Sequence, residues 1–256
     1  VDFFDKAQKV AAQKTLSVLR ISDFNTTGLT GSDKDYNTPW QNLVKASGVS
    51  DKGDDEGGSF GIGKSAPFAC SNLRTVFYAT EDINGLCASQ GVARLVSFPV
   101  KKGLIFQKDS DDITTGIGYY GEKLKNQSIR ECRSFQKGFM RTVPGTDVYI
   151  LGYMDKKGWE DEIIASVLDD FLISIFYGTL EVRVGKVEIS QRTLGTVVEV
   201  FKEKAVSAYN YYQAMTSKEA HVIKTDFNGL GDIELHLLIQ KDLHRRVLMG
   251  RSNGMK

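Results

Sequence analysis

The sequence contains little cysteine, histidine and proline. Its 256 residues include three cysteines (Cys70, Cys87 and Cys132), three histidines and four prolines. An odd number of cysteines without CxxC spacing fits neither a disulfide framework nor the common zinc motifs. The histidines lie far from the glycine cluster described below and show no metal-ligand spacing. We therefore interpret the thiols as small core residues of a chain in a reduced, cytoplasmic setting.

The sequence also lacks an excess of charge and a long apolar run. Lys and Arg number 33 against 32 Asp and Glu, so the net charge of +1 argues against a dominating polyanion-binding surface. No apolar stretch approaches the roughly 20 residues that a membrane span needs, and no signal peptide is visible. We therefore expect no membrane partner. The length suits one α/β domain with part of a second.

The apolar periodicity predicts alternating helices and strands over most of the chain. The strongest helical pattern covers residues 161–176 and ends at Gly178. A domain junction is expected near Ala214, which divides the chain into residues 1–214 and 215–256. Helices are expected over residues 3–14, 40–46, 65–72 and 194–212, and strands over 15–21, 74–80, 92–100, 103–106, 144–151, 179–184, 186–189, 233–239 and 246–249.

The chain is organised around a glycine-rich stretch that precedes a predicted helix and strand. Glycine lets the backbone approach a ligand closely, and N–H groups at a helix start form an anion site. The stretch therefore predicts a cradle for nucleotide phosphates. Its residues are Gly57-Gly58-Ser59-Phe60-Gly61-Ile62-Gly63-Lys64-Ser65-Ala66.

Two kinds of nucleotide-binding protein use such a stretch. Residues 58–65 satisfy the P-loop pattern GxxxxGK[ST], in which a buried strand runs directly into the loop. Residues 50–57, however, are almost wholly charged or glycine, which a buried strand does not tolerate. The context therefore disfavours a P-loop NTPase and leaves a second interpretation based on several motifs in order.

Four motifs follow one another along residues 1–185: Ile21-Ser22-Asp23 at a strand end, the polar stretch 30–56, the GxxGxG spacing of residues 58–63, and Gly145-Thr146 before a late strand. In this order the chain resembles the GHKL superfamily, which includes DNA gyrase, heat-shock chaperones, histidine kinases and MutL. The resemblance implies an α+β Bergerat fold, a two-layer sandwich with a mixed sheet covered by helices. Residues 215–256 resemble the start of a transducer-like second domain.

The resemblance implies an ATP site with Mg²⁺. Asp23 would accept a hydrogen bond from the adenine amino group, assisted by the Thr146 hydroxyl, and residues 30–57 would form a lid. The phosphates would lie along the N–H groups of residues 61–66. The implied binding residues are Asp23, Asn25, Gly28, Gly58, Phe60, Gly61, Ile62, Gly63, Lys64, Ser65, Ala66 and Thr146.

The sequence departs from the family pattern at two places. Asn25 and Thr27 stand where the family has the glycines of DxGxG; Asn tolerates a left-handed backbone, and Gly28 is expected to turn one residue late. The helix expected over residues 3–14 contains neither the general-base glutamate nor the magnesium-binding asparagine of the family. We therefore identify no catalytic residue, and from the abrupt start at Val1 we expect a fragment.

The leading hypothesis is an ATP-binding module, a slow ATPase in the full-length protein, whose lid closure drives homodimerisation or signals to a partner domain. Its process would be DNA transactions, chaperone-like remodelling or anti-phage defence, the last by association alone. The alternative is a non-catalytic nucleotide-binding or interaction module. Histidine kinase activity is disfavoured because no phosphoacceptor helix is present. Scattered basic runs, such as residues 101–102 and 244–246, give DNA contact only weak support.

Overall fold

The computed structural model describes residues 2–45, 63–97, 113–123, 126–135, 139–229, 231–241 and 245–249. The chain forms two compact units, Val1–Asp155 and Lys156–Lys256. Each unit has a hydrophobic core of its own. The predicted junction at Ala214 lies within helix α6 (Val206–Thr216) of the second unit. The division falls before helix α4 (Trp159–Phe176) because the apolar side chains of α4 pack against later residues of the chain.

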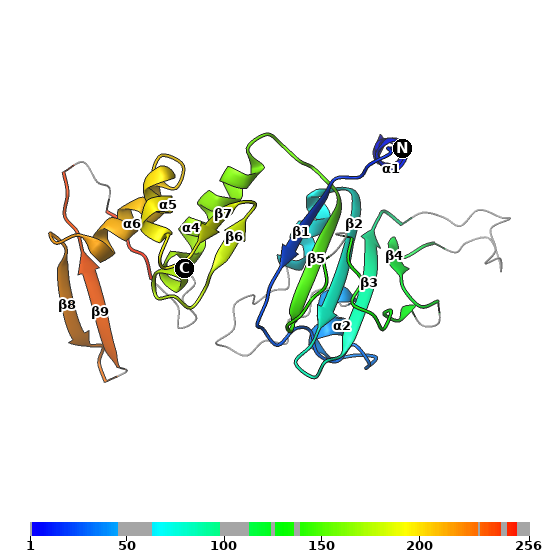
Figure 1. Cartoon of the computed structure of the whole chain (residues 1–256), viewed down its shortest axis with the longest axis horizontal. Coiled ribbons are helices and arrows are strands. Elements are labelled where there is room, and N and C mark those ends of the chain that lie inside the picture. Colours follow the sequence, from blue (N-terminus) through cyan, green and yellow to red (C-terminus); the bar gives the residue numbers. More distant parts are fainter. Residues whose placement is uncertain are drawn as a thin grey trace. The chain divides into compact units, whose positions relative to one another are not determined.

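The first unit contains a five-stranded sheet in the order β1-β5-β2-β3-β4 (Figure 1). The helices and this sheet give an α+β fold class. Every described pairing is antiparallel, so the mixed sheet expected from the resemblance is wrong for the described strands. Neighbouring β2 and β3 are joined by the short turn 82–86, which makes them antiparallel. The strands are β1 (Val18–Ser22), β2 (Ser71–Glu81), β3 (Cys87–Arg94), β4 (Ile117–Tyr120) and β5 (Gly145–Tyr153).

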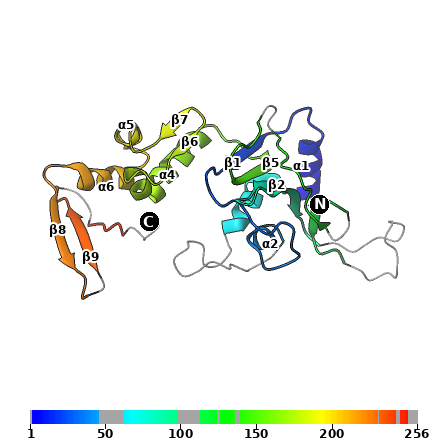
Figure 2. The ribbon, with the colours of Figure 1, turned by 60° about the horizontal axis from the view of Figure 1, so that its bottom comes forward.

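Side chains of β2 alternate between the two faces of the sheet. β-Branched and aromatic residues dominate residues 75–80, which favours a strand. Val76 and Tyr78 pack with Trp40 and Phe68 in the main core of the unit, and Phe77 packs with Tyr149 on the opposite face. One face of the sheet is therefore the core face, and Figure 2 shows α2 beneath it.

Helix α2 (Pro39–Val44) covers the core face. Thr38 caps its N-terminus by accepting a hydrogen bond from the Gln41 N–H (3.3 Å), and Pro39 occupies the first turn, where its missing N–H is tolerated. Trp40 is fully buried. The first part of the predicted lid is thus part of the core, while residues 46–57 lie outside the described residues.

Two further helical segments belong to the first unit. Helix α1 (Asp2–Ala11) is shorter than predicted, and Val10 lies beside Gly152 of β5. The predicted helix 65–72 is a 3-10 turn, Gly63–Ser65, followed by the single-turn α3 (Ala66–Ala69). It ends early because β2 begins at Ser71. The strand predicted over 92–100 overlaps β3 only at residues 92–94, and residues 95–97 form no strand. Residues 98–100 and the predicted strand 103–106 lie outside the described residues.

The second unit is built around α4. Its apolar side chains pack against α5 (Leu194–Val200), α6 and the hairpin β6 (Val182–Val184) and β7 (Val187–Ile189). Gly178 adopts φ +72° after the helix, which confirms the predicted C-cap. The helix predicted over 194–212 is interrupted after Val200, and α6 starts at Val206.

A second hairpin follows α6. It consists of β8 (His221–Asp226), which was not predicted, and β9 (Asp232–Leu237). The predicted strand 246–249 is wrong, because these residues have no regular structure. Within the part of the chain that the structure describes, no helix combines the length and apolar content that a membrane crossing requires.

Candidate functional site

Asp23 and Thr146 meet at the edge where β1 ends and β5 begins. Ser22 pairs with Asp147 as the last register pair of these antiparallel strands. The Asp23 N–H then donates to the Thr146 carbonyl (3.0 Å), and the Thr146 N–H donates to Asp23 Oδ1 (3.1 Å). The structure therefore brings together the two residues that were predicted to grip an adenine.

The Asp23 carboxylate is oriented by its own loop. The Thr26 hydroxyl donates to Asp23 Oδ1, the same oxygen that accepts from Thr146. Oδ2 accepts no hydrogen bond from the described residues. One carboxylate oxygen is thus fixed by the fold, and the other is available to an external hydrogen-bond donor.

Asp23 is exposed, whereas two hydroxyls on the core face of the neighbouring strands are buried. Thr80 of β2 pairs with Thr146, and their Oγ1 atoms are 3.3 Å apart. Thr80 is fully buried and Thr146 is 7% exposed. Thr80 Oγ1 also accepts from the Leu29 N–H (2.9 Å) and donates to the Gly145 carbonyl (3.0 Å). Thr80 was not predicted, because its place beside Thr146 depends on strand register.

The loop after Asp23 turns at the two positions expected from the sequence. Asn25 has φ +58° and Gly28 has φ +61°, whereas Thr27 does not have positive φ. A Cβ on Gly28 would lie 2.4 Å from the Glu81 carbonyl oxygen. Glycine is therefore required at position 28 by both backbone conformation and close approach to β2.

Arg141 supports the site through hydrogen bonds and was not predicted from the sequence. Its Nη1 donates to the Asp23 carbonyl (2.7 Å). Its Nε and Nη2 donate to the two carboxylate oxygens of Asp147 (3.2 and 2.9 Å), and the side chains of this pair are 2% and 4% exposed. The Ser22 hydroxyl donates to Asp147 as well. Arg141 thereby ties the start of the Asp23 loop to β5.

The structure describes only the last part of the glycine-rich stretch. Gly58, Phe60, Gly61 and Ile62 lie outside the described residues, so their predicted phosphate contacts stay predictions. Gly63 begins the 3-10 turn, and Ala66 begins α3.

Lys64 and Ser65 lie in that turn and contact other parts of the first unit. Lys64 Nζ donates to the Asn42 carbonyl (3.1 Å) at α2. Burial lowers the pKa of Lys64, and the neighbouring Arg94 lowers it further. Ser65 Oγ accepts from Arg94 (3.3 Å). These contacts attach the end of the glycine-rich stretch to α2 and β3, and the structure does not bring Lys64 or Ser65 into contact with Asp23.

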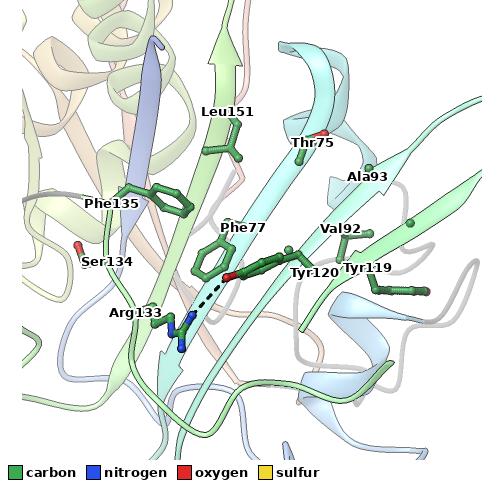
Figure 3. Close-up of a pocket in the computed structure, with 12 residues that line it drawn as sticks. Thr75, Phe77, Val92, Ala93, Tyr119, Tyr120, Arg133, Ser134, Phe135 and Leu151 are labelled. Atoms are coloured by element: carbon green, nitrogen blue, oxygen red, sulfur yellow. Dashed lines mark hydrogen bonds between the residues drawn. The ribbon is translucent and has the colours of Figure 1, made fainter. Parts of the chain in front are cut away.

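A separate cavity of about 670 Å³ lies on the opposite face of the sheet (Figure 3). Phe77, Tyr120 and Phe135 form aromatic walls, and Arg133 Nη1 donates to the Tyr120 hydroxyl (3.3 Å). None of the predicted site residues lines it.

One group of side chains near the site could hold a metal ion. Among the described residues, the only group of three or more His, Cys, Asp or Glu side chains able to share one ion is Glu81, Cys87 and Cys132. Two thiols make this a poor magnesium site, since Mg²⁺ prefers oxygen ligands. No described residue is therefore assigned as a ligand of the Mg²⁺ that would accompany ATP.

Comparisons of this chain with protein-family models, with curated proteins and with solved structures found no significant match.

Proposed function

We propose that this chain is an ATP-binding module of the GHKL type, whose first unit is a variant of the Bergerat fold with an antiparallel sheet. The observation that carries the proposal is the contact of Asp23 with Thr146, which are 123 positions apart in the sequence. The motif order alone did not require this contact. The strand order β1-β5-β2 also puts the strand after the glycine-rich stretch next to the strand of Thr146.

The chemistry of the pair suits an adenine. The exocyclic amino group of adenine is a hydrogen-bond donor, and Asp23 Oδ2 is an acceptor without a partner among the described residues. The Thr146 hydroxyl, held by Thr80, supplies a group that both donates and accepts. A hydrogen bond to a charged group contributes about 1.5–3 kcal/mol, which is enough to select one base over another.

The phosphate-binding part of the proposal rests on the sequence. The glycine spacing before Gly63 is that of a phosphate cradle, and the backbone there would supply N–H donors. Because α2 is part of the core, lid motion is not assigned to residues 39–44. Nucleotide-dependent homodimerisation is part of the proposal, and light scattering with and without ATP tests it.

A non-hydrolysing nucleotide-binding module is the second candidate. Helix α1 carries no glutamate and no asparagine, so this helix offers neither the general base nor the magnesium ligand of the family. Phosphate release measured with ATP separates the two candidates. ATP turnover that is lost when one carboxylate is substituted supports an ATPase. Tight ATP binding without turnover supports the second candidate.

Isothermal titration of ATP and ADP into the chain tests nucleotide binding itself. We expect stoichiometric binding by the wild type and a loss of about 10-fold or more in affinity for Asp23→Asn. Asp170→Asn is the matched control, because Asp170 is an exposed carboxylate on α4 of the second unit. A folded chain that binds neither nucleotide, or two variants with equal affinities, would refute the proposal.

A further inference from the structure

Two thiols and a carboxylate from three separate positions converge at the end of the β2–β3 hairpin. The Sγ atoms of Cys87 and Cys132 and a carboxylate oxygen of Glu81 lie within 4.8 Å of one another. Each of the three residues is half-buried, so the group is accessible from solvent. The prediction from the sequence that the cysteines are small core residues is wrong, because Cys70 is exposed and Cys87 and Cys132 are half-buried.

The hairpin places Glu81 and Cys87 side by side. They are direct cross-strand partners of antiparallel β2 and β3, so their side chains project from the same face. The turn between them is held by Asp82, whose Oδ1 accepts from the N–H groups of Asn84 (2.8 Å) and Leu86 (3.0 Å). The backbone thus fixes two of the three donor groups.

A separate strap, residues 129–133, brings in Cys132. Ser89 and Ile129 exchange two backbone hydrogen bonds (2.8 Å each), and the Arg133 N–H donates to Ser89 Oγ (2.8 Å). The Cys132 Sγ donates to the Thr80 carbonyl (2.9 Å) and lies within 4.8 Å of the Cys87 Sγ. The strap is therefore anchored on both sides of the third donor.

We infer that Glu81, Cys87 and Cys132 form a zinc site, with solvent water as the fourth ligand. Zn²⁺ takes thiolate and carboxylate ligands in tetrahedral geometry at about 2.0–2.3 Å, so the donors need to close by a small side-chain movement. Binding displaces the protons of the two thiols to the buffer and leaves two thiolates and one carboxylate on the ion.

The zinc inference does not rest on the proposed nucleotide function. The two groups of residues share Thr80, whose carbonyl contacts Cys132 and whose hydroxyl contacts Thr146.

Zinc titration of the reduced, chelator-stripped chain, in competition with a chromophoric chelator, tests the inference. One Zn²⁺ per chain is expected, with affinity lowered about 100-fold or more in Cys87→Ser and Cys132→Ser and less in Glu81→Gln. Cys70→Ser is the control, because Cys70 is an exposed free thiol at the end of α3. It is expected to leave the affinity unchanged.

The absorption spectrum of Co²⁺ bound to the wild type tests the same site without requiring that a variant folds. Co²⁺ bound here is expected to show a thiolate-to-metal charge-transfer band with the intensity of two thiolates, removed by one equivalent of Zn²⁺. Absence of stoichiometric zinc, cobalt bound without this band, or loss of the band in Cys70→Ser would overturn the inference. A Cys87–Cys132 disulfide whose reduced form takes up no zinc would overturn it as well.

Discussion

Asp23 and Thr146 exchange two hydrogen bonds across the end of β1 and the start of β5. One bond joins the backbones, and the other fixes a single carboxylate oxygen of Asp23. Because Thr26 donates to that same oxygen, the orientation of the carboxylate is set before any ligand arrives. This relationship supports the proposal that the first unit binds adenine. Three predictions test the packing of that unit, and a fourth tests the recognition of adenine.

The first prediction concerns the loop that carries Asp23. Gly28→Ala forces a positive φ on alanine and places Cβ against the Glu81 carbonyl, so we expect a loss of about 2 kcal/mol or more in the free energy of unfolding. Gly85→Ala is the matched control: φ is +75°, but nothing lies within 4 Å of its Cβ. For Gly85→Ala we expect a loss of about 1 kcal/mol in the free energy of unfolding. Urea denaturation measures both, and equal losses would show that the close approach to Glu81 does not matter.

The second prediction concerns the buried ion pair of Arg141 and Asp147. Arg141→Met leaves a buried carboxylate without its cation, and we expect the free energy of unfolding to fall by about 3–5 kcal/mol. Arg192→Met removes the exposed ion pair with Glu188 and is expected to change the free energy of unfolding by less than about 1 kcal/mol. Similar losses for the two variants in chemical denaturation would contradict the role given to Arg141.

The third prediction concerns Tyr78, which is 1% exposed and whose hydroxyl has no hydrogen-bond partner among the described residues. Tyr78→Phe is therefore expected to be neutral or to stabilise the chain by up to about 1 kcal/mol at pH 7. A clear destabilisation at pH 7 would show that the hydroxyl has a partner.

Tyr78 also predicts a pH dependence. Burial raises its pKa to about 12, while an unfolded tyrosine ionises near 10. Between these values the unfolded state binds fewer protons than the folded state. The contribution of Tyr78 to the free energy of unfolding is therefore fully present below pH 10 and is lost as the pH rises towards 12. In denaturation curves at pH 8, 10 and 11, the wild type should therefore lose more stability than Tyr78→Phe. Parallel curves would contradict the burial of this hydroxyl.

The local features of the first unit could be predicted from its sequence. The polar residue after a β-rich stretch located Asp23 at a strand end, and the tolerance of Asn25 and Gly28 for positive φ located the turns. These features depend on neighbouring residues alone. The helix 161–176 could be predicted for the same reason, since its apolar stripe and Gly178 are local signals.

Features that depend on register or on distant packing could not be predicted. Thr80 reaches the site because β2 and β5 pair in one particular register. Arg141 reaches Asp23 because β1 pairs with β5. The apolar stripe of α4 indicated burial, but not that its partners would be α5 and α6, so the unit boundary was expected too late. Cys132 meets Cys87 only through the strap anchored by Ser89.

The fourth prediction concerns the recognition of the adenine amino group by Asp23. In Asp23→Asn, the N–H of Thr146 and the hydroxyl of Thr26 would hold the amide oxygen, so the NH₂ group would point outward as a donor. A donor facing the adenine amino group cannot bond to it. The variant should therefore lose the ability to distinguish adenine from a purine without an amino group.

Titration of ATP and of purine riboside triphosphate, which lacks the amino group, into the wild type and Asp23→Asn measures this discrimination most directly. The account predicts that the wild type prefers ATP by about 10-fold to 100-fold and that the preference disappears in the variant. A wild type that binds the two nucleotides equally, or a variant that keeps the preference, would contradict the account.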